Sequence, residues 1–535
     1  MKNLLILLLL MAIPPLVAQE DAWVYLTDKP NVTASINNPI SILTQKAIDR
    51  KNRHGIFIDD RDVPVYEDYI SQLKAQPGIT VLAKSKWFNA IYVRGTQSNI
   101  NALNSLSFVD YIQFADSNLN ARNRSIAIDH KFQIENQQTT FVYGNTQNQV
   151  EMIAAEQLHL DDYTGEGITI AVMDSGFPDV NTIAAFSRLR TNGDLLDGYD
   201  FVDRTANIYA YAGSSHGTRV LSDMAGYIEN QFVGTAPDAS YYLFRTEDAA
   251  SENPVEESYW VEAAERADSL GVDIINTSLG YTTYDNPNYS YSPSDMDGNT
   301  AFITQGATIA SEKGLLVVTS AGNSGANSWQ IVGAPADSPL VLSVGAVNAS
   351  GEYAFFSSQG SSAQPTQKPD VVAQGFSAYV VDENNAIVQN NGTSFSSPIL
   401  CGGVACLMQA LPNTTPPNDI IEFVRQSASQ YTTPDDFLGH GIPNLDLARN
   451  LGLSINDYNL RGVSVYPNPF QEKLVINASD LDAIIQLSIY NQLGQLIYTK
   501  KGRIEAIDVS ELNSGIYVVS VISGDQSANF KLIKN

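Results

Sequence analysis

Cysteine is nearly absent from this sequence, with two residues in a chain of 535. Two thiols are too few for a disulfide scaffold or a multi-cysteine zinc framework, so packing must provide the stability. Cys401 and Cys406 lie five positions apart within residues 398–410, an apolar stretch of small residues that predicts a helix. Five positions turn a helix by about 500°, which places the two side chains on different faces. We therefore expect two small buried residues with no bridge between them.

Basic residues are also scarce, at 31 Lys and Arg against 58 Asp and Glu, for a net charge of −27. This negative field repels phosphate backbones and anionic lipids, which excludes nucleic acid as an expected partner. Charged residues make up only 17% of the chain and hydrophobic residues 44%, a composition typical of folded domains. At about 150 residues per domain, the length predicts two to four folded units.

Long hydrophobic runs are missing except at the amino terminus. There, Lys2 precedes a leucine-rich run over residues 4–11, and the small residues Val17 and Ala18 follow. The run is shorter than the roughly 20 residues that a membrane-spanning helix needs. The pattern predicts a secretory signal peptide over residues 1–18 rather than a membrane anchor, and hence a secreted protein.

Residues 19–148 mix two hydrophobic periodicities. The predicted strands are 22–26, 79–82, 88–93 and 109–114, and the predicted helices are 40–51, 66–75 and 97–106. Together they predict a small open α+β sandwich. Residues 120–149 are rich in Asn, Gln, Arg and Thr without sustained periodicity, which predicts an exposed linker.

Between residues 149 and 453, apolar strand patterns alternate with amphipathic helical patterns. The predicted strands are 167–173, 240–245, 272–276, 315–320 and 341–347, with helices that include 255–270 and 298–313. This alternation predicts an α/β domain, a parallel sheet with helices on both faces. In such sheets, reactive groups gather beyond the carboxyl ends of the strands.

Three residues fit that expectation. Asp174 ends the apolar strand of "GITIAVMDSGF", and a buried carboxylate is costly without a hydrogen-bonding partner. His216 in "SSHGTRV" is the candidate partner; a lone histidine is more often a surface or core residue, but the carboxylate favours a functional pair. Ser394 in "NGTSFSSP" opens a predicted helix, where Thr393, Ser396 and Ser397 suit the same capping role. The set Asp, His, Ser favours Ser394 as a nucleophile.

Five motifs over residues 165–453 resemble those of the subtilisin-like serine proteases, or subtilases, in family order. They are "AVMDSGF", "SSHGTRV", "IINTSLG", "TSAGNSG" and "NGTSFSSP". The order Asp, His, Ser along the chain is that of subtilisin. The resemblance implies a subtilisin-like fold and a secreted serine endopeptidase that acts on proteins or peptides. No cofactor is required for that chemistry, and we expect a monomer.

The resemblance implies a role for four residues. Asp174 orients His216 and stabilises its cation, His216 takes the hydroxyl proton of Ser394, and Ser394 attacks the scissile carbonyl to form an acyl-enzyme. Asn323 in "AGN" donates to the developing oxyanion together with the Ser394 backbone N–H. An Asn beside a Gly is otherwise most often a turn residue.

Substrate contacts are implied in the same way. Ser278, Leu279 and Gly280 resemble the edge strand that pairs with an extended substrate. Ala321 and Gly322 resemble the facing wall of the primary specificity pocket. The residue preference of that pocket stays open.

Residues 19–148 resemble a subtilase propeptide by position, by α+β pattern and by the strand "FVDYIQF". This implies a zymogen. Parallel sheets fold slowly because their contacts are non-local, which gives a chaperoning segment a role.

Residues 463–535 alternate apolar and polar positions between Asn, Gly and Asp turns, which predicts a small antiparallel β-sandwich. "VYPNPF", "LNSGIYVVSV" and the basic "KLIKN" ending resemble the C-terminal sorting domain of type IX (Por) secretion cargo. The resemblance implies passage through the outer membrane by the type IX secretion machinery, followed by release or surface attachment. An adhesive sandwich module is the alternative.

Metal ligands cannot be assigned from the sequence. In "SDMDGN" (residues 294–299), the position of Gly298 does not match the pattern of a calcium-binding loop. We therefore interpret this segment as a helix-capping loop. Structural calcium elsewhere is compatible with the subtilase resemblance. His54, His130 and His159 lack ligand spacing and are expected to be surface or packing residues, and His440 in "GHGIPN" a closing turn.

Two other functions compete with the protease interpretation. A non-catalytic surface or adhesion protein on a protease scaffold is disfavoured by the complete set of catalytic residue types. A serine esterase or lipase would carry its serine on a G-x-S-x-G elbow and its histidine last in the chain, and the sequence shows neither.

Overall fold

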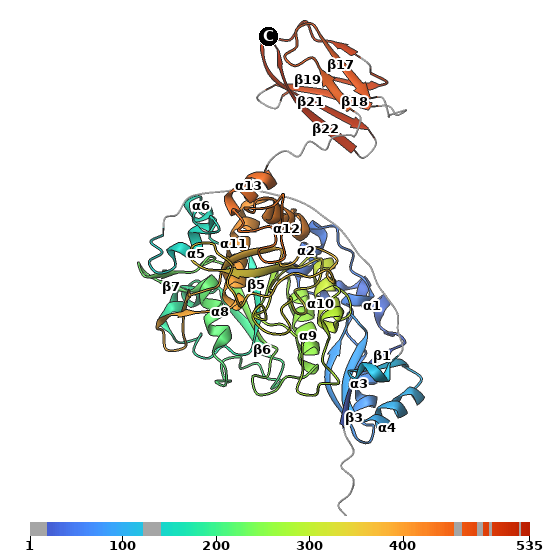
Figure 1. Ribbon diagram of the computed structural model, residues 1–535. Coiled ribbons are helices and arrows are strands. Elements are labelled where there is room, and N and C mark those ends of the chain that lie inside the picture. The colour runs from blue at the N-terminus through green and yellow to red at the C-terminus, as the bar shows by residue number, and fades with distance from the viewer. Residues whose placement is uncertain are drawn as a thin grey trace, which may run out of the picture. The chain divides into compact units, whose positions relative to one another are not determined.

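The computed structural model describes residues 19–120, 141–453, 463–478, 485–491, 495–504, 506–523 and 526–534. The expected signal peptide, His130 and most of the expected linker lie outside the described residues. The chain divides into two compact units, residues 1–453 and 454–535. The first unit holds an N-terminal domain (19–120) and a larger α/β domain (141–453), shown in blue and in cyan to orange in Figure 1.

A seven-stranded sheet forms the centre of the α/β domain, with every neighbouring pair parallel. The strand order is β13-β12-β11-β10-β5-β9-β6. Along the chain these are β5 (Thr169–Asp174), β6 (Leu195–Asp200), β9 (Ser240–Arg245), β10 (Ile274–Thr277), β11 (Leu316–Ser320), β12 (Leu342–Val347) and β13 (Val371–Gln374). The predicted parallel α/β fold is confirmed.

Helices cover both faces of this sheet because its side chains alternate between two cores. Ile170 and Val172 of β5 point into a core shared with α8 (His216–Ala225) and α11 (Thr393–Ala410). Ala171 and Met173 point into the opposite core, shared with α9 (Val255–Leu270) and α10 (Phe302–Glu312). The remaining elements of the domain are α5 (Gln147–Glu151), α6 (Ala155–Leu160), α7 (Ser187–Asn192), α12 (Pro417–Gln426), α13 (Leu445–Leu453) and the hairpins β7–β8 (Tyr227–Ile228, Phe232–Val233) and β14–β15 (Ala378–Val381, Ile387–Asn390).

The two strands at the sheet edges, β6 and β13, are absent from the sequence prediction. The edge strand β6 reads LLDGYD, in which aspartates and a glycine interrupt the apolar pattern. The other edge strand, β13, has only four residues. Pairing with β9 and β12, rather than local pattern, makes these segments strands.

The N-terminal domain is an antiparallel sheet of four strands in the order β2-β3-β1-β4. One face of this sheet packs on its own helices: Ala22 and Val24 of β1 share a core with Leu73 of α3 and Ile100 of α4. The elements are β1 (Gln19–Leu26), α1 (Val32–Asn37), α2 (Gln45–Arg53), α3 (Glu67–Lys74), β2 (Ile79–Ser85), β3 (Ala90–Thr96), α4 (Gln97–Ala102) and β4 (Val109–Phe114). The predicted open α+β sandwich is confirmed.

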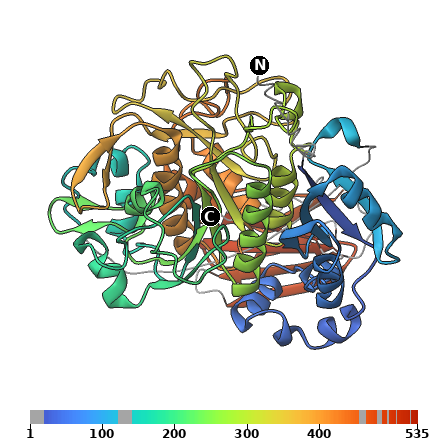
Figure 2. The same ribbon diagram turned by 90° about the horizontal axis from the view of Figure 1, so that it is seen from below.

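The other face of that sheet packs on α9 and α10 of the α/β domain. Trp23, between Ala22 and Val24, donates its indole N–H to Ser258 Oγ at 2.9 Å, and its ring centroid lies 4.8 Å from that of Phe302. The ring centroid of Tyr92 of β3 lies 5.0 Å from that of Trp23 in the same core. Figures 1 and 2 both show the blue strands and α2 beside the green helices. Successive side chains of β1 therefore pack alternately into the core of the N-terminal domain and into the core that it shares with α9 and α10.

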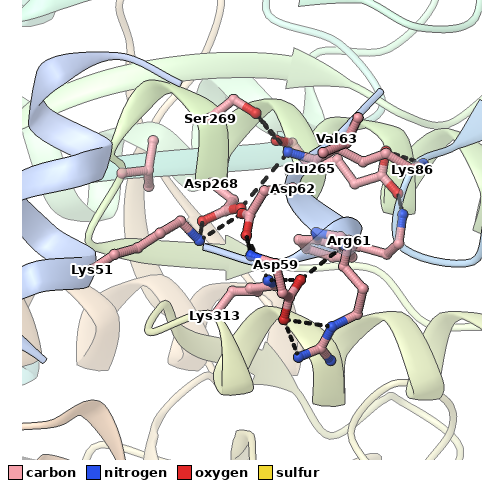
Figure 3. Close-up of polar contacts among 12 residues, drawn as sticks. Lys51, Asp59, Arg61, Asp62, Val63, Lys86, Glu265, Asp268, Ser269 and Lys313 are labelled. Carbon is pink, nitrogen blue, oxygen red and sulfur yellow. Dashed lines mark hydrogen bonds and ion pairs between the residues drawn. The ribbon is translucent and has the colours of Figure 1, made fainter. Parts of the chain in front are cut away.

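Buried ion pairs extend this contact along α9 (Figure 3). Lys51 of α2 contacts Asp268 of α9 at 2.8 Å and Asp62 at 3.0 Å, and Lys313 contacts Asp62 at 2.8 Å. Burial raises the pKa of Asp268, but the charges of Lys51, Arg50 and Lys86 outweigh it, and the net shift is downward. Asp268 is thus held as a carboxylate between the two domains.

The second unit is a small antiparallel β-sandwich, as predicted. One sheet has the order β16-β17-β20 and the other β19-β18-β21-β22. Leu474 and Ile507 of the first sheet share a core with Leu487 and Val519 of the second. The strands are β16 (Val463–Tyr466), β17 (Lys473–Ala478), β18 (Ile485–Asn491), β19 (Leu496–Gly502), β20 (Ala506–Asp508), β21 (Gly515–Ser523) and β22 (Gln526–Lys534).

Candidate active site

Asp174 and His216 form a hydrogen-bonded pair at the carboxyl end of β5. His216 Nδ1 lies 2.8 Å from Asp174 Oδ1 and 3.0 Å from Oδ2. Asp174 is fully buried and also accepts from the Ser175 backbone N–H at 2.7 Å. His216 is the first residue of α8, and Gly217 lets this helix approach β5, since an added Cβ would lie 2.9 Å from Asp174 Cβ. The pair is thus positioned by a strand end and a helix start.

The electrostatic balance at His216 favours its cation. Burial lowers the pKa of His216, whereas the charge of Asp174 and the hydrogen bond to it raise it, and the net shift is upward. Because a carboxylate can only accept, Nδ1 carries the proton of the neutral ring, which leaves Nε2 as the proton-accepting nitrogen.

Ser394 is the second residue of α11 and is buried. Its hydroxyl donates to the backbone carbonyl of Ser278 at 3.2 Å, and not to His216. The adjacent Phe395 ring lies 5.8 Å from the His216 ring, centroid to centroid. The start of α11 therefore lies beside His216, with the serine hydroxyl turned toward β10.

Pro398 explains a second bond between the same two segments. In an α-helix the carbonyl of Ser394 would accept from the N–H of residue 398, which proline lacks. The Ser278 hydroxyl donates to that carbonyl instead, at 2.9 Å. Sequence reasoning expected only backbone pairing from Ser278, and the missing N–H of Pro398 is the signal that points to this contact.

Asn323 lies next to the start of α11. Its side-chain oxygen accepts from the Thr393 N–H at 2.8 Å and from the Thr393 hydroxyl at 3.0 Å. Since a backbone N–H can only donate, the atom facing it is the oxygen, and Nδ2 is left to donate elsewhere. Nδ2 lies 3.6 Å from the position that a Cβ on Gly392 would occupy. Thr393, which the sequence presented only as an alternative cap, is therefore the residue that orients this amide.

The expected substrate-contacting residues lie at the ends of β10 and β11. Ser278 is buried, Leu279 half-buried and Gly280 exposed, and the described hydrogen bonds leave the backbone groups of Leu279 and Gly280 unused. Ala321 is buried, and Gly322 has a φ of +102°, a conformation that favours glycine. Because β10 and β11 are neighbours, the two segments lie side by side.

The other histidines and both cysteines have packing roles in the described residues. His159 is fully buried, with Nδ1 2.8 Å from the Tyr143 hydroxyl and Nε2 3.0 Å from the Thr235 carbonyl oxygen. Burial lowers its pKa to about 4. His54 is buried, and His440 lies in a turn whose flanking glycines both have positive φ. Cys401 and Cys406 are free and buried, as predicted.

In the part of the chain that the structure describes, no three His, Cys, Asp or Glu side chains group around one position. In the 294–299 loop, Asp297 accepts from the backbone N–H groups of Asn299 at 2.9 Å and Thr300 at 2.7 Å. Its carboxylate thus satisfies the turn that precedes α10, which agrees with the capping interpretation.

Family models match three parts of the chain. Residues 165–441, more than half of the chain, match the Subtilase family. Residues 21–131 match the Peptidase S8 propeptide domain of Bacteroidota, and residues 464–535 match the Secretion system C-terminal sorting domain.

Individual relatives match about half of the chain. Subtilisin E of Bacillus subtilis (strain 168) is 32% identical over 306 residues, which cover 56% of this chain and 70% of that protein. Subtilisin of Bacillus pumilus is 31% identical over 306 residues, which cover 56% of this chain and 97% of that protein. The crystal structure of MycP1 with the N-terminal propeptide removed is 23% identical, with a TM-score of 0.43, and the match covers 56% of this chain and 96% of that chain.

The sorting domain indicates type IX secretion to the cell surface or the extracellular space. Among the described residues, no helix combines the length and the apolar character needed to cross a membrane. On the matched subtilase core, propeptide and sorting domain, the chain belongs to the subtilase family, as a secreted serine endopeptidase made in zymogen form.

Proposed function

We propose that Asp174, His216 and Ser394 hydrolyse peptide bonds as a catalytic triad. Ser394 Oγ attacks the scissile carbonyl carbon while His216 Nε2 takes the hydroxyl proton. When the C–N bond breaks, His216 returns that proton to the leaving amine and an acyl-enzyme remains on Ser394. Water then attacks the ester with the same imidazole as base, releasing the carboxylic acid and restoring the serine.

The observation that carries this proposal is the contact of His216 Nδ1 with both carboxylate oxygens of Asp174, at 2.8 and 3.0 Å. It commits one ring nitrogen to the carboxylate and leaves Nε2 to take the hydroxyl proton of Ser394. For attack, the Ser394 hydroxyl must leave the Ser278 carbonyl and face His216. One side-chain torsion separates staggered positions of a serine hydroxyl, so the change is small.

Two donors near Ser394 suit the developing oxyanion. The Ser394 backbone N–H belongs to the first turn of α11, where amide groups lack an intrahelical acceptor. Asn323 Nδ2 is free to donate because Thr393 engages only the side-chain oxygen. We propose that these two N–H groups stabilise the tetrahedral intermediate.

We also propose how the chain is divided for maturation. Residues 1–18 would be the signal peptide, 19–148 the propeptide with its linker, 149–453 the catalytic domain and 463–535 the sorting sandwich. The mature enzyme would act as a monomer on proteins or peptides, with no nucleic acid partner, and any bound calcium would be structural.

Replacement of the nucleophile tests the mechanism. Ser394→Ala should abolish hydrolysis of a denatured protein substrate and labelling by an active-site phosphonate. Ser396→Ala is the matched control: its hydroxyl donates only to the Thr393 carbonyl, at 3.0 Å, so activity should persist. Cleavage by purified Ser394→Ala would contradict the proposal. A processed wild-type protein that no active-site probe labels would instead favour the non-catalytic surface protein.

A further inference from the structure

An acidic groove of about 560 Å³ opens beside the proposed triad. His216 and Ser175 line it on the side of β5, and Ser278 and Leu279 on the side of β10. Two loops complete it, and their charged side chains are all carboxylates: Glu247, Asp248, Glu252 and Asp285. The groove is therefore part of the cleft that a substrate would enter, and its lining carries four acidic groups but no lysine or arginine.

Few positive charges compensate these carboxylates. Glu247 is only 9% exposed, and it pairs with no lysine or arginine that the structure describes. Glu252 and the exposed Asp285 likewise lack a basic partner, and the nearest cation to Asp248 is Arg245, at 3.8 Å. Burial, reinforced by neighbouring carboxylates, raises the pKa of Glu247 and of Glu252. A cation in the groove would favour their ionised forms.

A metal ion is a poor fit for this charge. No three carboxylate, imidazole or thiol groups in the described residues converge on one position, and the four acids come from two loops that are joined by the hydrogen bond of the Glu252 N–H to Asp285. Spaced carboxylates along an open groove suit several extended cationic groups better than one compact ion.

The order of strands sets which substrate side chains face the groove. At the carboxyl edge of the sheet, β11 leads into Ala321 and Gly322, β10 into Ser278, β5 into Ser175 and β9 into Glu247. An extended substrate along Ser278–Gly280 turns alternate side chains to opposite sides. If the residue before the scissile bond faces Ala321 and Gly322, the second and fourth residues before that bond face the acidic side.

We propose that the groove binds lysine or arginine side chains at the second and fourth residues before the scissile bond. This inference rests on the proposed peptidase function and names its substrate class: peptides with basic residues two positions apart. The chain itself contains such a sequence, Arg122 and Arg124 in "ARNRSI", within residues 120–149, the expected linker of the propeptide. A peptide of this sequence is a natural probe.

Fluorogenic peptides with a constant residue at the first position test the proposal. The mature wild-type enzyme should cleave peptides with Arg at the second and fourth positions with a kcat/KM roughly tenfold or more above that for Leu at both. The double variant Glu252→Gln/Asp285→Asn should lower kcat/KM for the Arg peptide by more than it lowers kcat/KM for the Leu peptide, and so remove most of this ratio. Asn at 285 keeps an acceptor for the Glu252 N–H, which now bonds to Asp285 at 3.1 Å. Added salt should lower the ratio in the wild type only.

Glu166→Gln/Glu229→Gln is the matched control, because these two exposed acids lie outside the groove and their replacement removes the same two negative charges. Its Arg-to-Leu ratio should equal that of the wild type. A wild-type ratio near one, or an equal ratio in the double variant, would overturn the proposal while hydrolysis itself persists. A calcium-dependent melting temperature lost only in the double variant, with the ratio intact, would make the groove a metal site and also overturn it. Loss of all hydrolysis in Ser394→Ala tests the peptidase function separately.

Discussion

At the level of single residues, each proposed site residue has one polar atom that is hydrogen-bonded to a neighbouring group. Thr393 occupies the oxygen of Asn323, and Asp174 occupies Nδ1 of His216. Each contact leaves the other end of the side chain for substrate chemistry. The same reasoning applies to Ser278, whose hydroxyl takes the carbonyl that Pro398 leaves without a helical donor.

The pH dependence of kcat/KM should report the His216–Asp174 pair. His216 acts as a base only when neutral, so activity falls as pH drops through its pKa. Because that pKa is raised above its ordinary value of 6.5, the acid limb of the wild type should lie above 6.5. Asp174→Asn removes the raising charge and leaves the lowering effect of burial, so the limb should move to lower pH.

The Asp174→Asn measurement needs a sensitive substrate, since loss of the carboxylate in such triads lowers turnover by about 10⁴. An acid limb at the same pH in both proteins would show that another group controls it. The raised pKa of His216 also affects the stability of the folded protein. The protonated imidazole stabilises the fold at pH values below its ordinary pKa, and this stabilisation is lost as pH rises through the raised pKa.

At the level of elements, α9 joins the propeptide to the protease. One side of this helix packs on the central sheet, and its other side meets β1–β3 and α2 of the propeptide. Glu265 of α9 accepts from Ser85 Oγ and from the Lys86 and Trp87 backbone N–H groups, the latter two at 2.9 Å. Burial raises the pKa of Glu265 to about 7. Glu265 of α9 thus binds the segment that joins β2 to β3 in the propeptide.

Removal of Lys51 should weaken this contact strongly. In the full-length Ser394→Ala background, Lys51→Met leaves Asp268 and Asp62 with less buried positive charge, which should lower the free energy of unfolding by about 3 kcal/mol. Lys84→Met is the control, since its pair with Glu67 at 2.7 Å is solvent-exposed and should contribute less than about 1 kcal/mol. Denaturant titration measures both, and equal losses would contradict the proposed importance of the buried network.

At the level of the whole molecule, the C-terminal residues 454–535 form a separate compact unit, of which residues 464–535 match a secretion sorting domain. Its hydrophobic core is built from its own two sheets. Deletion of residues 454–535 should therefore leave kcat/KM of the activated enzyme within about twofold of the wild type, because the site residues all belong to the first unit. The same deletion should remove the protein from the culture medium and cell surface of a type IX-competent host.

Fractionation and immunoblotting measure that outcome, with the Ser394→Ala full chain as a control for export without activity. Appearance of the truncated protein outside the cell in normal amounts would show that the sorting domain is dispensable. A large loss of kcat/KM on truncation would show that the sandwich supports the catalytic unit.

Much of the fold was predictable because its signals are local. The strand 240–245 and the helix 255–270 have the predicted bounds, and Pro254 and Gly271, residue types typical of helix boundaries, flank the helix. The edge strands β6 and β13 were not predictable, because only their neighbours make them strands. Local pattern also does not reveal the contacts of the aromatic residues between Tyr281 and Tyr291. Tyr284 and Tyr291 donate to the buried Glu257 of α9, a partner outside their own segment.

The sequence by itself determined which chemical groups are present, their order along the chain and the periodicities that form strands and helices. These properties depend on residue type and near neighbours. The tertiary structure alone decided which groups meet: the serine hydroxyl with the Ser278 carbonyl, the propeptide lysines with α9, and four carboxylates from two loops in one groove. Parallel strands joined by crossover connections bring distant segments to one sheet edge, so those meetings are set by strand order and not by local pattern.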